Sequence, residues 1–169
     1  KTPPIMKTGI TKAVALFTLF FTATLAFSQS LPINFENDVT TSDFEDFDGG
    51  TATVLANPQS NGINTSATVA QIVRNGGAEW SGSKINLTSN LDFSTLGSIS
   101  MKVFTTAPVG TTVKFKLEGN GHAERDAQTT VTNEWETLTW DFTGEPANFN
   151  WLVFMFDVGN VGNGSINST

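Results

Sequence analysis

The chain lacks several residue types on which whole classes of protein site depend. Its 169 residues include no Cys, no Tyr and a single His. Without Cys there are no disulfides, no thiol nucleophile and no Cys-ligated zinc or iron–sulfur site. One His leaves a histidine-rich metal site out of reach. Basic residues are also scarce, at nine Lys and Arg against 16 Asp and Glu. Because phosphate contacts need basic side chains, this balance argues against binding to DNA or RNA.

The remaining composition favours a single β domain rich in turns. Charged residues make up only 15% of the chain, Gly occurs 15 times, and Ser, Thr and Asn are plentiful. This length suits one domain and is sufficient to bury a sizeable core. A helical bundle would carry more charged residues and fewer turn-formers.

Residues 1–28 have the order of a secretory signal peptide. Lys7 and Lys12 precede an apolar run over residues 13–27, and Ala26-Phe27-Ser28 supplies small residues for cleavage before Gln29. The alternative is a retained N-terminal anchor, but the run is shorter than a typical membrane span. We therefore expect an exported protein, secreted or at the cell surface, with no membrane contact after cleavage.

Removal of the leader makes the remaining domain, residues 29–169, strongly acidic. Met6 is the expected start of translation. The leader contains three of the nine basic residues and no acidic residue, so six basic and 16 acidic residues remain, a net charge of −10. A secreted domain without disulfides must be held by packing or by a bound cation.

Short segments with period-two alternation follow the leader. For example, the apolar residues Val113, Phe115 and Leu117 alternate with the charged residues at 114, 116 and 118. This pattern places one face of a strand on a core. Gly-rich turns such as Asn75-Gly76-Gly77 separate the segments. No segment shows helical spacing, which predicts an all-β sandwich or barrel. The alternating segments are 31–36, 51–56, 68–74, 99–105, 113–118, 137–142 and 152–157.

The last residues, 163–169, have the pattern of a turn that leads into another strand. The sequence does not include that strand, and a sandwich without it would expose unpaired backbone. We therefore interpret residues 29–169 as a sandwich that is missing its last strand, at the start of a longer protein.

Several of these segments together resemble a carbohydrate-binding module of the galactose-binding-like β-jelly-roll type. Such modules occur in secreted polysaccharide-degrading proteins, especially those of marine Bacteroidetes. The resemblance implies a jelly-roll β-sandwich, non-catalytic sugar binding and a structural calcium ion. In such modules paired acidic residues of the last strand help to hold the calcium, and that strand is outside this sequence. The segments that carry the resemblance are 31–36, 75–87, 113–131, 133–144 and 152–160.

Tryptophan is the first candidate for sugar contact, because a flat aromatic ring buries the apolar face of a sugar. Trp140 shares the phase of the apolar residues of its strand, which favours the core. Trp135 has the opposite phase and is either a platform or a cap on the core. Trp151 has the phase opposite Leu152, so its face either lines a groove or lies under a loop. Trp80 follows a Gly-rich loop and either contacts a ligand or folds over the edge of the sandwich.

Polar side chains near the same loops are the second set of candidates, since sugar hydroxyls need convergent donors and acceptors. The candidates are Arg74, Glu79, Glu118, Arg125 and Asp126. Arg suits bidentate contact with neighbouring hydroxyls. For Arg125 and Asp126 the alternative is an ion pair with each other at the tip of a hairpin.

Acidic residues between 36 and 48 suggest a cation, because Ca²⁺ prefers oxygen ligands. The resemblance to the binding modules favours Glu36 as a ligand of calcium, and the side chain of Asp48 is a second candidate. The alternative is a solvated acidic face.

The domain is predicted to be non-catalytic. A glycosidase needs two carboxyl groups facing one sugar, and the Glu-x-Asp-x-Glu run of laminarinase-like jelly-roll enzymes is absent. We expect binding to a polysaccharide or oligosaccharide, by a module tethered to further domains. Two alternatives stay open: a structural or adhesive sandwich without a sugar site, and the N-terminal part of a glycoside hydrolase or polysaccharide lyase with its catalytic domain downstream.

Overall fold

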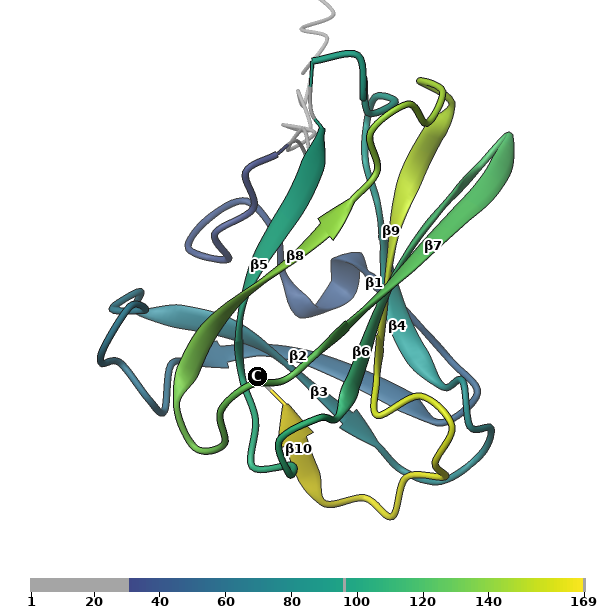
Figure 1. The fold of residues 1–169 in the computed structure, drawn as a ribbon. Helices are drawn as coiled ribbons and strands as arrows, with labels where there is room; N and C mark the ends of the chain where they lie inside the picture. The colour runs from purple at the N-terminus through teal and green to yellow at the C-terminus, as the bar shows by residue number, and fades with distance from the viewer. Residues whose placement is uncertain (1–30, 96, 169) are drawn as a thin grey trace, which may run out of the picture.

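The computed structural model describes residues 31–95 and 97–168, so the signal peptide expected at 1–28 lies outside the described residues. The chain forms a two-layer β-sandwich (Figure 1). In this part of the chain no helix is long and apolar enough to cross a membrane. The elements are η1 (Thr41–Asp43), β1 (Phe44–Phe47), β2 (Gly50–Ala56), β3 (Thr68–Arg74), β4 (Gly82–Asn86), β5 (Ser98–Phe104), β6 (Thr112–Gly119), β7 (Gly121–Gln128), β8 (Trp135–Asp141), β9 (Phe149–Phe156) and β10 (Ile166–Ser168).

The two layers differ in continuity. One layer is a five-stranded antiparallel sheet with the order β1-β4-β9-β6-β7. The other layer comes in two parts, a three-stranded sheet β10-β3-β2 and a two-stranded sheet β5-β8. In Figure 1 the labels of the five-stranded sheet gather on the right, and β5 and β8 lie on the left. The predicted all-β sandwich is confirmed.

Aromatic rings join the layers in the core. Phe115 of the five-stranded sheet lies 5.2 Å from Trp140 of β8 and 5.3 Å from Phe154 of β9, measured between ring centroids. Trp140 is fully buried, and its Nε1 donates to the carbonyl oxygen of Val113 at 3.1 Å. The hydrogen bond satisfies the one polar group that this ring brings into the core. The core position predicted for Trp140 is confirmed.

Gly49, Gly76 and Gly77 let two loops pack backbone against backbone at one end of the sandwich, a contact called the glycine lock below. Asp48 and Gly49 join β1 to β2 with φ angles of 51° and 101°, the positive values that a type I′ turn needs. A Cβ on Gly49 would lie 2.0 Å from the carbonyl oxygen of Gly76, and a Cβ on Gly77 would lie 2.0 Å from that of Asp48. The Ala78 N–H donates to the Asp48 carbonyl at 3.0 Å. The two backbones can therefore touch only because side chains are absent.

The strand predicted at residues 31–36 does not form. The Asp38 carboxylate accepts hydrogen bonds from the N–H groups of Asn34 and Phe35, both at 2.8 Å, and Phe35 has a φ of 62°. This local hydrogen bonding replaces the ladder of a strand. Leu31, Ile33 and Phe35 nevertheless pack against the core, so the apolar phase was read correctly.

Candidate functional site

The outward-facing side of the five-stranded sheet, called the outer face below, carries three rows of side chains. Cross-strand pairing sets the rows, because residues directly opposite one another point to the same side of a sheet. The first row is Phe47, Gly82, Met155, Lys114 and Asp126; the second is Glu45, Lys84, Val153, Lys116 and Glu124; the third is Asn86, Trp151, Glu118 and His122.

An apolar stripe lies under a layer of lysines on this face. Val153 and Met155 point outward from β9, yet both are buried. Their cross-strand neighbours are Lys84, Lys114 and Lys116, whose side chains are mostly buried. Long lysine stems can cover apolar surface while the ammonium groups stay in water. The outer face therefore presents charged groups above a closely packed apolar base.

Each lysine of the outer face is paired with carboxylates. Lys84 lies 3.0 Å from Glu45, and Lys116 lies 2.7 Å from Glu118. Lys114 contacts both Glu124, at 3.1 Å, and Asp126, at 3.0 Å. The face thus alternates hydrogen-bond donors and acceptors with little free charge, an arrangement that matches the hydroxyl groups of a sugar.

A hollow of about 340 Å³ is lined by the ion pair of Lys116 with Glu118 and by Lys84, which lies 3.9 Å from the same Glu118 carboxylate. Its apolar base is formed by Phe47, Val153 and Met155, and its polar groups come from Lys84, Lys116, Glu118 and Asp48. Trp80 stands at its side. Sugar sites combine apolar surface with a few convergent polar groups, and the hollow has both.

Trp80 is the most exposed aromatic contact of the hollow, with 59% of its surface accessible. Its Nε1 donates to Asp48 Oδ2 at 2.9 Å. The Asp48 turn is fixed in its place by the glycine lock with Gly76 and Gly77. The ring is thus held at one edge while most of the residue's surface stays exposed, so little conformational freedom is lost when a ligand stacks on it.

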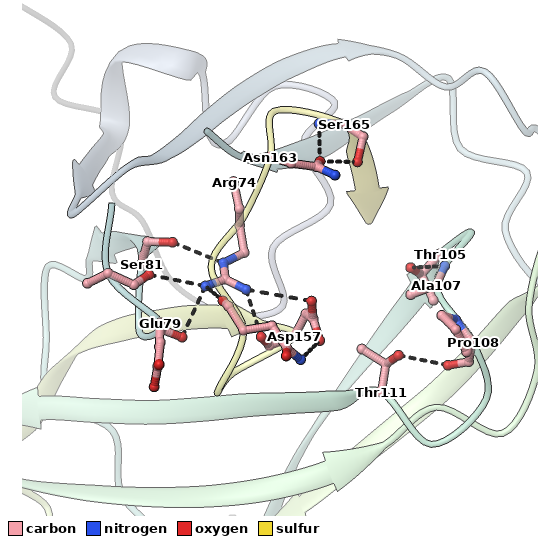
Figure 2. Close-up of polar contacts among 12 residues, drawn as sticks. Arg74, Glu79, Ser81, Thr105, Ala107, Pro108, Thr111, Asp157, Asn163 and Ser165 are labelled. Carbon is pink, nitrogen blue, oxygen red and sulfur yellow. Dashed lines mark hydrogen bonds and ion pairs between the residues drawn. The ribbon is translucent and has the colours of Figure 1, made fainter. Parts of the chain in front are cut away.

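Arg74 holds the loop of Trp80 from inside the protein (Figure 2). Only 1% of its surface is exposed. Its guanidinium donates to Ser81 Oγ at 2.9 Å and to the carbonyl oxygens of Glu79, at 3.0 Å, and Asp157, at 2.7 Å. The carbonyl oxygens of Ala78 and Asn160 accept further bonds. The prediction that Arg74 contacts a sugar is wrong, because burial and carbonyl partners occupy its donors.

Burial lowers the pKa of Arg74 from its ordinary value, while the carboxylate of Asp157 acts in the opposite direction. Asp157 Oδ2 lies 3.9 Å from Nη1. Arginine begins from so high a pKa that it stays charged, and a buried charge needs these partners to be tolerated.

Trp151 lies in the third row of the outer face, beside the hollow. It is partly buried, between Asn86 of β4 and Glu118 of β6. Lys84 Nζ lies 4.7 Å from the ring centroid, within cation–π range. With the Asn86 amide oriented so that its oxygen faces the ring, Trp151 Nε1 donates to it at 2.9 Å. Of the two readings from the sequence, the structure favours the one in which Trp151 borders a groove.

Glu118 and Asp126, both predicted from the sequence, are on the outer face. Glu118 lines the hollow, and Asp126 pairs with Lys114 in the first row. Desolvation acts to lower the pKa of Lys114, but hydrogen bonds with Asp126 and Glu124 outweigh it and raise the pKa above the ordinary lysine value. This ammonium group is therefore held in place by its carboxylate partners.

Two other predicted contacts, Trp135 and Arg125, lie elsewhere. Trp135 is 8% exposed, and its Nε1 donates to the Gln59 carbonyl at 2.7 Å, so it caps the core and is not a platform. Arg125 points away from the outer face, 5.3 Å from the Phe142 ring, and pairs with Glu145 at 2.7 Å. It therefore does not pair with Asp126, because neighbours in a strand face opposite sides.

Glu79 is exposed, directly before Trp80. Its carbonyl oxygen accepts hydrogen bonds from Arg74 and from the Gly159 N–H. The backbone of this residue is thus part of the loop's anchor.

The two residues expected to bind calcium are separated. Glu36 Oε1 accepts the Ala67 N–H at 2.7 Å, next to the start of β3, whereas Asp48 accepts the indole N–H of Trp80 near the end of β3. Within residues 31–95 and 97–168, no group of three or more His, Cys, Asp or Glu side chains could hold a metal ion. Glu36 and Asp48 do not fit one site, and calcium stays a prediction without a side-chain donor set.

The comparisons with known proteins concern the fold. No family model matches the chain, and no curated protein does. The family 11 carbohydrate-binding module from Clostridium thermocellum, solved with a β-1,3-1,4-mixed-linked tetrasaccharide, is similar with a TM-score of 0.53 and 13% identity over 77% of this chain and 86% of that one. The N-terminal CBM22-1–CBM22-2 tandem domain of Paenibacillus barcinonensis Xyn10C has a TM-score of 0.50 and 16% identity over 86% of this chain and 44% of that one. The chain therefore has the jelly-roll β-sandwich fold of carbohydrate-binding modules, as the sequence predicted.

Proposed function

We propose that this domain binds a neutral polysaccharide on the outer face without chemically changing it. Trp80 supplies the main stacking surface, and Trp151 extends the site along the sheet. The hydroxyl groups of the sugar bond to Lys84, Lys116 and Glu118 around the hollow. The observation that carries the proposal is the exposed Trp80 ring, fixed by Asp48 beside a hollow with paired donors and acceptors.

The charges of the outer face favour a neutral sugar over an anionic one. Its three lysines are already paired with carboxylates, and the face has four carboxylates in all: Glu45, Glu118, Glu124 and Asp126. A uronic acid or sulfate group would have to displace one of them in a domain that is acidic overall. We expect binding to a neutral glycan to depend little on salt, because few counterions are displaced.

The wider setting of the domain is part of the proposal. The leader predicted at residues 1–28 supports export, and a weak binding surface on a small domain suits attachment to a larger glycan-processing or surface protein. The fold similarity to carbohydrate-binding modules supports the same role.

Affinity electrophoresis of the full chain tests the proposal. Gels contain a mixed-linkage β-glucan, a neutral xylan or mannan, or the anionic polysaccharide alginate. We expect retardation by at least one neutral glycan and none by alginate. Trp80→Ala is expected to weaken association about tenfold, equivalent to ~1.4 kcal/mol. Val109→Ala, an equally exposed apolar residue on the loop between β5 and β6, is the control and is expected to bind normally.

Two outcomes would contradict this function. Normal retardation of Trp80→Ala would remove the outer face as the site. Absence of retardation by every glycan, together with Trp fluorescence that no glycan changes, would favour a structural or adhesive sandwich instead.

A further inference from the structure

Four Asn-Gly dipeptides lie in the turns and loops of the chain, and the structure holds them with different firmness. An asparagine before a glycine is prone to lose its side-chain amide, because glycine has no side chain to shield its backbone nitrogen from the asparagine Cγ. The reaction needs that nitrogen to reach Cγ, so it depends on how freely the two residues move. The dipeptides are Asn61-Gly62, Asn75-Gly76, Asn120-Gly121 and Asn163-Gly164.

Asn163 is held at both reacting groups. The Gly164 N–H, which would have to attack, donates to the carbonyl oxygen of Arg74 at 2.7 Å. The side-chain Oδ1 of Asn163 accepts the N–H of Ser165 at 2.9 Å, a contact shown in Figure 2. Both bonds must break before the ring of the intermediate can close.

Asn75 and Asn120 are held by residues from other parts of the chain. The Asn75 N–H donates to the Gly49 carbonyl at 2.7 Å, and its Nδ2 donates to Thr51 Oγ1 at 2.9 Å. Asn120 donates its N–H to the Asn148 carbonyl at 3.0 Å and accepts the Asn148 side-chain amide at 2.7 Å. The backbone on which each asparagine sits is therefore restrained by a second segment.

Asn61 is held only by its own loop between β2 and β3. Its N–H donates to the Gln59 carbonyl at 2.7 Å, and its carbonyl accepts the Asn64 N–H at 3.1 Å. In the part of the chain that the structure describes, neither the Asn61 side chain nor the Gly62 N–H has a hydrogen-bond partner. Both residues are exposed, and a Cβ built on Gly62 would have nothing within 4 Å. Exposed loop tips of this kind move most easily.

We propose that Asn61 is a site of spontaneous deamidation in the folded protein, with water as the only co-reactant. The Gly62 nitrogen gives up its proton to a base and forms a bond with Asn61 Cγ. The bond between Cγ and the side-chain nitrogen breaks, and that nitrogen leaves as ammonia with a proton from the solvent. Water then opens the five-membered imide at one of its two carbonyl carbons, which produces either aspartate or isoaspartate at position 61.

The modification would act on the loop and leave the outer face intact. Each product adds one negative charge, and isoaspartate also lengthens the main chain by one carbon atom inside the turn closed by Asn64. The same loop supplies the Gln59 carbonyl that accepts the indole N–H of Trp135 at 2.7 Å. The loop belongs to the layer opposite the five-stranded sheet, so the proposal stands or falls independently of sugar binding.

Incubation of the full chain at mildly alkaline pH, folded and in urea, tests the proposal. Peptide mass spectrometry measures the loss of amide at each of the four asparagines and distinguishes aspartate from isoaspartate. In urea we expect similar rates, because each asparagine precedes a glycine. In the folded chain we expect Asn61 to react fastest and to keep most of its rate in urea. Asn75 and Asn163 should be slowed at least about tenfold, because they must first open locally. Faster reaction at any of the other three, or the same relative rates with and without urea, would overturn the proposal.

A glycine variant tests the chemical route. Gly62→Ala places a Cβ in open space beside the attacking nitrogen and should slow the reaction of Asn61 at least about tenfold. Gly110→Ala is the matched control, since Gly110 also has a positive φ angle and open space around a Cβ, and should leave the rate at Asn61 unchanged. An unchanged rate in Gly62→Ala would mean that the Gly62 nitrogen does not attack, which would overturn the proposed route.

Discussion

The two ends of β3 differ in how firmly the two layers of the sandwich are joined. At its C-terminal end, Arg74 and the glycine lock tie the layers together through hydrogen bonds to the loop before β4 and the segment after β9. Toward its N-terminal end, β3 borders a cavity of about 610 Å³ that is also lined by β5, and the second layer is divided. The candidate sugar site lies at the end of β3 where Arg74 joins the layers. The comparison teaches that the candidate binding surface is built where hydrogen bonds and close backbone contacts hold the loops in place.

The largest expected effect comes from removing the buried hydrogen bonds of Arg74. Arg74→Met keeps similar volume but leaves buried carbonyl oxygens without donors, and should lower the free energy of unfolding by about 4 kcal/mol. The chain's other arginine provides the control. Arg125→Met removes an ion pair with Glu145 at a partly exposed side chain and should cost less than about 1 kcal/mol. Urea denaturation followed by Trp fluorescence measures both. Equal losses would mean that the buried hydrogen bonds of Arg74 contribute no more to the free energy of unfolding than the ion pair of Arg125.

A matched pair of core substitutions compares the complete sheet with the open layer. Ile85 of β4 is 0% exposed, and Ile99 of β5, at 7%, lines the cavity beside β3. Ile85→Ala should cost about 4 kcal/mol, because the closed packing cannot collapse into the space. Ile99→Ala should cost about 2 kcal/mol, since it only enlarges an existing cavity. Urea unfolding checks both variants. A larger loss for Ile99→Ala than for Ile85→Ala would contradict the prediction, because Ile99 would then be the more closely packed of the two.

The glycine lock can be separated from simple backbone strain. Gly77 and Gly110 have similar positive φ angles, 83° and 89°, but a Cβ would meet another backbone only at Gly77 and would have open space at Gly110. Gly110→Ala should cost about 1 kcal/mol through its φ angle alone. Gly77→Ala should cost at least ~2 kcal/mol, since the new Cβ would meet the Asp48 carbonyl. Thermal melts compare the two, and comparable midpoints would remove the lock as a cause of rigidity.

The smallest expected effect concerns charge on the outer face. The pKa of Lys114 is raised in the folded protein, so its ion pairs stabilise the fold below the unfolded pKa. That stability is lost as the pH rises through the folded pKa, above about pH 10.4. Lys114→Met should reduce the loss of stability between neutral pH and about pH 11, by less than ~1 kcal/mol. Unfolding curves at both pH values give the difference, and identical pH dependence would contradict it.

The sequence predicted the strands whose apolar residues alternate cleanly. Phe115 and its neighbours, Trp140 and Phe154 were all assigned the correct face. β1 and β4 were missed because both place polar residues toward the interior. Asp46 Oδ1 accepts the Ser83 hydroxyl at 2.6 Å and the Ala52 N–H at 2.9 Å, so these interior positions are satisfied by one another. Such pairing depends on residues far apart in the chain and leaves no alternation to read.

The candidate site was predicted only in part, because some of its residues also depend on contacts between segments far apart in the chain. Trp80, Trp151 and Glu118 were identified from loop position and phase. Lys84 and Lys116 were missed as site residues, although the outward phase of Lys116 was visible beside Phe115 and could have indicated it. The burial of Arg74 could not be inferred, because its partners at Asp157 and Asn160 are more than eighty residues away.

The chemistry of the Arg74 anchor leaves the neighbouring surface free to change. In the loop before β4, the guanidinium binds the main-chain oxygens of Ala78 and Glu79. Those oxygens stay in place whichever side chains the two residues carry. Substitutions at positions 78 to 80 can therefore alter what the surface recognises while the loop keeps its path. Arg74 thus allows the ligand preference of this surface to change while the path of the loop is kept.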